Sequence, residues 1–181
     1  MDELHNALER MLQGLAYWIA YKNEINIIGL KETDIVSEAA AILTTHLHNY
    51  RVKSEVDYSL LNHSLQKQYA DLGIFSYADQ KYQCIIEFKL GENTNGGYKK
   101  DVEKLHQLKT LEKNIKCFVI LAYRKSCSVN VPRMFVTKDG TAKKRIQIVS
   151  DKAKVKVRRV CKAHCSTKAK KNKKVICLEV L

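Results

Sequence analysis

Three charged side chains interrupt two otherwise apolar stretches of the sequence. Asp71 stands near the start of ADLGIF, residues 70–75, and Glu87 and Lys89 stand inside QCIIEFKL, residues 83–90. Side chains two positions apart on a β-strand point to the same face, so a carboxylate and an ammonium group share one face of the second stretch. Burying such charges is costly unless they are paired or hold a metal ion. The alternatives are therefore a metal site and an ion pair between Glu87 and Lys89 on the solvated face of an edge strand, with Asp71 in a turn.

The elements that must position these residues follow from the apolar periodicity. Residues 1–22 repeat apolar side chains at helical spacing, and residues 31–50 predict a second helix whose N-cap is Thr33 or Asp34. Residues 51–61 alternate and are rich in β-forming side chains, so they predict a strand ahead of the two charged ones. A third helix over residues 99–114 and a buried apolar strand over residues 116–124 complete a β-α-β unit. We therefore expect an α/β domain with a mixed sheet flanked by helices.

The last third of the chain has a different pattern. Residues 133–150 predict a hairpin that turns at Asp139 and Gly140. Residues 154–162 and 175–181 predict a second hairpin, which turns at the lysine-rich residues 166–174. The expected organisation is a core over residues 1–125 and a basic β-hairpin extension over residues 126–181, within the same domain.

The order of these elements resembles that of the PD-(D/E)xK nuclease superfamily, whose members share the restriction-endonuclease-like fold. The pieces that carry the resemblance read ADLGIF, CIIEFK and YKKDVEKL, with Asp71 on one strand and Glu87-x-Lys89 on its partner. The resemblance covers about residues 36–123, where we expect the site. One departure is Ala70, which stands where the motif has proline.

The resemblance implies a role for each of these residues. Asp71, Glu87 and the backbone carbonyl of Phe88 are expected to hold Mg²⁺, or Mn²⁺, and Lys89 to position or activate a water molecule. Phosphodiester cleavage needs a hard cation, and Mg²⁺ takes oxygen ligands with only one or two carboxylates. Lys89 would also stabilise the charge of the pentavalent phosphate.

A further acidic residue is expected to reach the metal directly or through water. Glu38, on the second predicted helix, matches the acidic residue that many members of the superfamily carry there. Glu55, on the first predicted strand, is its rival, and Asp57 shares the face of Glu55. The choice between Glu38 and Glu55 stays open.

Positive charge concentrates near the end of the chain. Residues 1–150 carry 21 Lys and Arg against 17 Asp and Glu, a net charge of +4, whereas residues 151–174 carry 11 against one, a net charge of +10. Nucleic acid is the commonest partner for such a segment, although lysine-rich segments can also serve only to solvate a chain. The residues expected to contact nucleic acid are Tyr98, Lys99, Lys100, Lys168, Lys170, Lys171, Lys173 and Lys174. For the first three, the alternative is a solvated first helical turn.

Six irregularly spaced cysteines in a chain long enough for a core indicate free thiols, a reducing compartment and hence the cytoplasm. No membrane partner is expected, because no run approaches the roughly 18 apolar residues of a membrane-spanning helix. Cys161, His164, Cys165 and Cys177 raise the question of a zinc site, but a second matching pair of ligands is missing unless His164 and Cys177 complete it.

The function that the resemblance implies is a metal-dependent endonuclease that hydrolyses phosphodiester bonds in DNA. It would be either a restriction-type enzyme or one selective for branched structures such as Holliday junctions. One site cuts one strand, so double-strand cleavage would need a homodimer or two successive nicks. The alternatives are a non-catalytic nucleic-acid-binding module with a nuclease-like fold and an RNA-associated basic protein. The sequence does not distinguish DNA from RNA.

Overall fold

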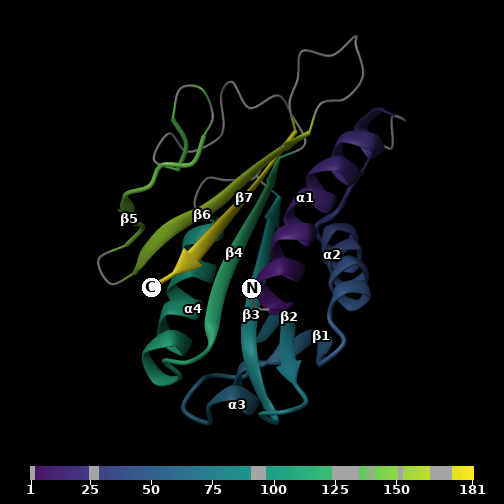
Figure 1. Ribbon diagram of the computed structural model, residues 1–181. Helices are drawn as coiled ribbons and strands as arrows, with labels where there is room; N and C mark the ends of the chain where they lie inside the picture. Colours follow the sequence, from purple (N-terminus) through teal and green to yellow (C-terminus); the bar gives the residue numbers. More distant parts are fainter. Residues whose placement is uncertain are drawn as a thin grey trace.

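The chain folds into a seven-stranded mixed sheet with helices on both faces (Figure 1). The computed structural model describes residues 3–24, 29–90, 97–123, 135–137, 139, 141–150, 153–163 and 173–181. The helices are α1 (Glu3–Glu24), α2 (Glu32–His46), α3 (Tyr58–Leu61) and α4 (Gly97–Leu111). The strands are β1 (Tyr50–Asp57), β2 (Tyr69–Ser76), β3 (Lys81–Leu90), β4 (Lys116–Tyr123), β5 (Ile146–Ile148), β6 (Lys154–Ala163) and β7 (Lys173–Val180).

The strand order is β1-β2-β3-β4-β7-β6-β5. β1, β2 and β3 pair antiparallel, whereas β3 and β4 pair parallel. Parallel neighbours need a crossover, and α4 provides it, which confirms the predicted β-α-β unit. β7 pairs with β4 and β6 pairs with β7, both antiparallel. The segments before and after residue 125 therefore share one sheet.

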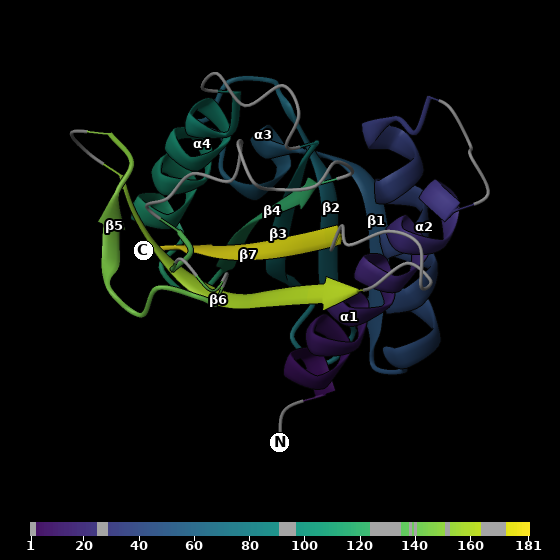
Figure 2. The same cartoon turned by 90° about the horizontal axis from the view of Figure 1, so that it is seen from above.

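Each face of the sheet packs against its own helices (Figure 2). α1 and α2 cover one face, where Ile86 and Phe88 of β3 join the apolar core. α4 covers the other face with Leu105 and Leu108, which pack in the same cluster as Ile85 and Val119. β3 thus runs through the middle of the sheet, and its remaining side chains alternate toward α4. Of the helices in the described ranges, none combines the length and apolar character of a membrane span.

Two element boundaries differ from the prediction because side chains cap the backbone. The strand predicted over residues 51–61 ends at Asp57, whose carboxylate accepts a hydrogen bond from the Ser59 backbone N–H and starts α3. α2 begins at Glu32 with Lys31 as its N-cap, so the predicted cap at Thr33 or Asp34 is wrong. The Asp34 carboxylate instead accepts from the Lys31 N–H at 2.7 Å, as in a capping box.

The C-terminal hairpins are confirmed in part. β6 and β7 form the second predicted hairpin, from Val155 opposite Val180 to Ala163 opposite Lys173. Val136 and Ala142 form a single bridge around the expected turn, of which Gly140 lies outside the described residues. The extension of this first hairpin to residue 150 is wrong. β5 pairs with β6 instead, and the Val149 N–H donates to the Ala153 carbonyl beside this pairing.

Candidate active site

β2 and β3 separate at the end of the sheet that carries the predicted acidic residues. Their regular register ends at the pair of Leu72 and Ile86. One residue further out, Asp71 Oδ2 accepts a hydrogen bond of 2.7 Å from the backbone N–H of Phe88. The Asp71 side chain therefore bridges the two strands beyond their last backbone pair. The contact uses the amide of Phe88, whereas the expected metal ligand was its carbonyl.

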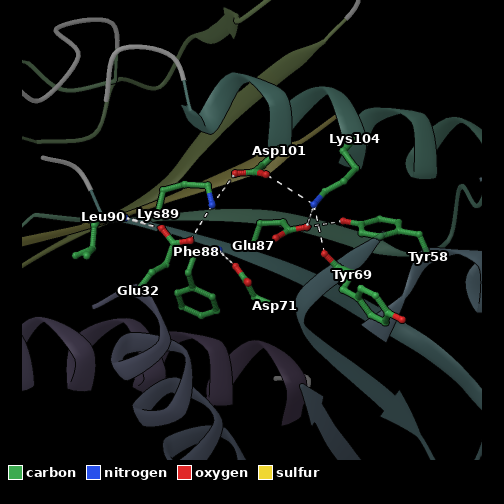
Figure 3. A network of polar contacts seen from close by, with 10 residues as sticks. All are labelled: Glu32, Tyr58, Tyr69, Asp71, Glu87, Phe88, Lys89, Leu90, Asp101 and Lys104. Atoms are coloured by element: carbon green, nitrogen blue, oxygen red, sulfur yellow. Dashed lines mark hydrogen bonds and ion pairs between the residues drawn. The ribbon is translucent and has the colours of Figure 1, made fainter. Parts of the chain in front are cut away.

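Glu87 projects from β3 toward α4 and is only 2% exposed (Figure 3). Its Oε1 accepts a hydrogen bond of 2.8 Å from the Tyr58 hydroxyl and lies 2.5 Å from Lys104 Nζ. Tyr58 reaches this position because the Asp57 cap ends β1 and turns the chain into α3. Glu87 is thus a buried carboxylate held from both α3 and α4.

Lys89 shares the face of Glu87 but has different partners. Its Nζ lies 2.8 Å from Glu32 Oε1 and 3.4 Å from Asp101 Oδ2. Glu32 also accepts a hydrogen bond of 3.2 Å from the backbone N–H of Leu90. β3 is a central strand with Glu87 buried, so the alternative of a solvated ion pair on an edge strand is wrong.

Asp101 connects the two lysines. It is 8% exposed, and its carboxylate oxygens lie 3.4 Å from Lys89 Nζ and 3.7 Å from Lys104 Nζ. Figure 3 shows these side chains meeting between α4, β3 and the start of α2. We call the following six residues the charged cluster: Glu32, Asp71, Glu87, Lys89, Asp101 and Lys104.

Burial and neighbouring charges shift the ionisation of this cluster. Burial and, to a smaller extent, the charge of Asp71 raise the pKa of Glu87 to about 7, although Lys104 opposes the shift. Burial also raises the pKa of Asp101, against the effect of both lysines. Burial alone would lower the pKa of Lys89, but its hydrogen bond to Glu32 and the charge of Asp101 outweigh this and raise it. Lys89 therefore stays charged, whereas Glu87 titrates near neutrality.

The donor set of the cluster fits a cation that needs few protein ligands. Among the residues that the structure describes, no three His, Cys, Asp or Glu side chains gather closely enough to hold a metal ion. Mg²⁺ is usually bound through one or two carboxylates, with water and substrate phosphate completing its shell. Asp71 and Glu87 supply two hard carboxylates, and Glu87 already faces a positive charge on Lys104. These two carboxylates match, in number and type, those through which Mg²⁺ is usually bound.

The acidic residue that reaches the cluster from α2 is Glu32, not Glu38. Glu38 lines a separate cavity of about 420 Å³ together with Trp18 and Lys22. Glu55 is exposed and has a left-handed backbone with φ of 52°. Within the described part of the chain, neither carboxylate has a hydrogen bond or ion pair to the cluster.

The sequence contained signals for the residues that the prediction missed. Asp34 lies three residues after Lys31, the N-cap to N3 spacing of a capping box, which is consistent with Glu32 in the first turn of α2, although lysine is not a usual N-cap residue. Asp101 and Lys104 are three apart, so both lie on one side of the predicted third helix. Leu105, next to Lys104, marks the side that faces the sheet.

The residues expected to contact nucleic acid lie in several places. Tyr98 is 5% exposed and packs edge-on against Phe135, so it lies in the core and not on the surface that the prediction needs. Lys99 and Lys100 are exposed on the first turn of α4. Lys174 is half-buried on β7. Three of the predicted lysines, and the side chain of a fourth, lie outside the described residues: Lys168, Lys170, Lys171 and the side chain of Lys173.

Two of the four candidate zinc ligands lie within the described residues. Cys161 on β6 and Cys177 on β7 are buried free thiols in the core. His164 and Cys165 lie outside the residues that the structure describes.

Comparison of the chain with known protein families, with curated proteins and with solved structures finds no match. The function must therefore be inferred from the geometry of the charged cluster.

Proposed function

We propose that this protein is a metal-dependent endonuclease of the PD-(D/E)xK superfamily, with a restriction-endonuclease-like fold, that hydrolyses phosphodiester bonds in DNA. The observation that carries the proposal is Glu87, a carboxylate only 2% exposed on a central strand. A buried acid with a pKa near 7 lowers stability, and such perturbed groups concentrate at functional sites. Asp71 on the next strand and Lys89 two residues on complete the residue types that the chemistry requires.

Each member of the charged cluster has a part in this proposal. Asp71 and Glu87 would hold Mg²⁺ or Mn²⁺, together with the carbonyl of Phe88. The metal would act as a Lewis acid that neutralises charge on the phosphate and lowers the pKa of a bound water molecule. Lys89 would offer a fixed positive charge to the phosphate oxygens as negative charge develops on them.

Glu32 and Asp101 are positioning residues in this scheme. Both carboxylates pair with Lys89 Nζ, at 2.8 and 3.4 Å, and so fix the direction of its ammonium group. A long lysine side chain has many rotamers, and holding it in place lowers the entropy that must be lost when substrate binds. Lys104 neutralises Glu87 in the metal-free protein, which explains how this carboxylate is retained in the interior.

The partner and setting follow from the same proposal. DNA is the expected substrate, and the net charge of +10 over residues 151–174 would hold its backbone. Cutting both strands would take two copies of the chain or two successive nicks. Cytoplasmic location remains a prediction, supported by the free thiols of the four described cysteines, Cys84, Cys117, Cys161 and Cys177.

A non-catalytic nucleic-acid-binding module is the second candidate. It is favoured by the pairing of both cluster lysines with carboxylates and by the lack of a three-ligand metal group among the described residues. Such a module would bind DNA with strong salt dependence and would not cut it.

Cleavage of supercoiled plasmid and of a branched DNA junction, with Mg²⁺ or Mn²⁺, separates these candidates. We expect metal-dependent nicking by the native protein and a loss of roughly 100-fold or more in Glu87→Gln and Lys89→Ala, as is typical when a stabilising group of the transition state is removed. Preference for the junction would indicate structure-selective action, and discrete plasmid products would indicate a restriction-type enzyme.

Matched controls exist on the same elements. Glu103→Gln changes an exposed carboxylate on α4, and Lys81→Ala removes an exposed lysine at the far end of β3. Both controls should cut like the native protein. Retention of DNA without cleavage of either substrate would favour the binding module.

A further inference from the structure

A cavity of about 350 Å³ opens directly beside Glu87. Its lining comes from α3, from the segment that joins α3 to β2, and from α4: Tyr58, Ser64, Leu65, Gln66, Gln68, Lys104 and Gln107. Tyr58 and Lys104 are the two side chains that hold Glu87 Oε1. The cavity therefore shares Tyr58 and Lys104 with the surroundings of Glu87.

Neutral hydrogen-bonding groups dominate the lining of the cavity. Gln66, Gln68 and Gln107 carry amides, each of which both donates and accepts hydrogen bonds, and Ser64 adds a hydroxyl. Leu65 contributes an apolar, half-buried wall. Among the described residues that line the cavity, none is a carboxylate.

The cation in the lining is already engaged elsewhere. Lys104 Nζ lies 2.5 Å from Glu87, 3.7 Å from Asp101 and 3.5 Å from the Tyr69 carbonyl oxygen. The cavity thus offers little free positive charge to a phosphate group. It suits a neutral ligand that has one apolar face and both donors and acceptors at its edge, which describes a nucleobase.

Hydrogen bonds hold the segment that lines the cavity in place before any ligand binds. The Tyr58 N–H donates to the Gln68 carbonyl at 2.8 Å, and the Leu65 N–H donates to the Asn62 carbonyl at 3.0 Å. The Asn62 side chain in turn donates to Glu112 beyond the end of α4 at 2.9 Å. Such preorganisation lowers the entropy lost on binding.

We propose that this cavity binds one base of the nucleic acid, next to the phosphate that is cut at Glu87, and makes the reaction sensitive to the identity of that base. This inference rests on the proposed function for the position of the scissile phosphate. Glutamine amides pair in a bidentate way with N6 and N7 of adenine, so adenine is the expected preference.

Two readouts test the proposal, one of which needs no cleavage. First, single-stranded DNA carrying 8-vinyladenine, a fluorescent adenine analogue that keeps N6 and N7, is scanned position by position in Ca²⁺. The native protein should change the fluorescence at one position, and Gln66→Ala or Gln107→Ala should remove the change.

Second, the bases flanking the cuts are read from a randomised DNA pool in Mg²⁺. At one position, one base should be enriched roughly tenfold or more, and the same variants should remove this enrichment.

The altered side chains are exposed, so the variants should fold like the native protein, which thermal unfolding checks. Gln147→Ala on β5, at the opposite edge of the sheet, is the control and should keep both signals. A signal retained in Gln66→Ala and Gln107→Ala, or the lack of any favoured position in both readouts, would overturn the inference. Absence of cleavage with a position-specific fluorescence change would instead reject the nuclease while leaving the base site in place.

Discussion

At the scale of single residues, the ionisation of Glu87 makes the stability of the folded protein depend on pH. Its environment combines a buried position, a hydroxyl donor from Tyr58 and an ammonium group from Lys104. The pKa of Glu87 rises from 4.5 to about 7, so the folded protein binds this proton more tightly than the unfolded chain does. The stabilisation from the proton is complete below about 4.5 and is lost as the pH rises to about 7.

Glu87→Gln should therefore remove a pH dependence. Between pH 4.5 and about 7, the free energy of unfolding of the metal-free native protein should fall relative to that of Glu87→Gln by about 3 kcal/mol, which denaturant titrations at several pH values measure. The glutamine cannot ionise and so lacks this loss. If the free energies of unfolding of the two proteins changed in parallel with pH, the pKa of Glu87 would not be raised in the folded protein.

The sequence predicted the individual acidic residues better than it predicted their partners. The two-residue period of a strand places Glu87 and Lys89 on one face without knowledge of the fold, and the structure has them there. Glu32, Asp101 and Lys104 depend on where helices begin and how they pack across the sheet. Those contacts span long stretches of sequence, so local patterns carry little information about them.

At the scale of elements, the packing of side chains from β1 and β3 over β2 depends on a glycine. A Cβ atom at Gly73 would lie 2.7 Å from Val56 Cγ2 and 2.8 Å from Tyr82 Cε1, which is closer than carbon atoms pack. Val56 and Tyr82 thus lie directly over the backbone of β2, two residues from Asp71. The strand that carries Asp71 is held in place by this close approach.

Gly73→Ala should lower the free energy of unfolding by about 1–3 kcal/mol, the usual cost of overpacking. Gly97→Ala is the matched control, because a Cβ there meets nothing within 4 Å and alanine favours the first turn of α4. Chemical denaturation of both variants measures the difference. Equal stability of Gly73→Ala and the native protein would mean that β1 and β2 can shift to make room.

The prediction of elements failed where side chains, rather than apolar periodicity, set a boundary. The strand at residues 51–61 contains good β formers throughout, and only the Asp57 cap turns its last four residues into α3. The first C-terminal hairpin was overextended because β5 has the strand pattern but pairs with β6. Alternation identifies a strand and does not identify its neighbour.

At the scale of the whole molecule, the concentration of positive charge and the candidate site lie in different parts of the sequence. The net charge of +10 lies in residues 151–174, whereas the charged cluster comes from residues 32–104. The shared sheet joins the two regions through the pairing of β7 with β4. The sequence predicted both features, but the place of β7 between β4 and β6 required the structure.

Replacing Lys168, Lys170 and Lys171 by glutamine should weaken DNA binding at all sequences and flatten its salt dependence. The slope of log K against log salt should fall by about 0.9 for each phosphate contact that is lost. Binding measured over a series of salt concentrations gives the slope. Gln at the exposed Lys81, the first residue of β3, and at the exposed Lys113, which precedes β4, should leave it unchanged. An unchanged slope in the triple variant would show that these lysines do not touch the DNA backbone.

The most direct test of the central claim measures DNA binding and DNA cleavage by the same samples of native protein and Asp71→Asn in Mg²⁺. We expect that both proteins retain the DNA, that only the native protein cuts it, and that a chelator abolishes the cutting. Equal cutting by both proteins, or retention without cutting by either, would contradict the assignment of Asp71, Glu87 and Lys89 to metal-dependent cleavage.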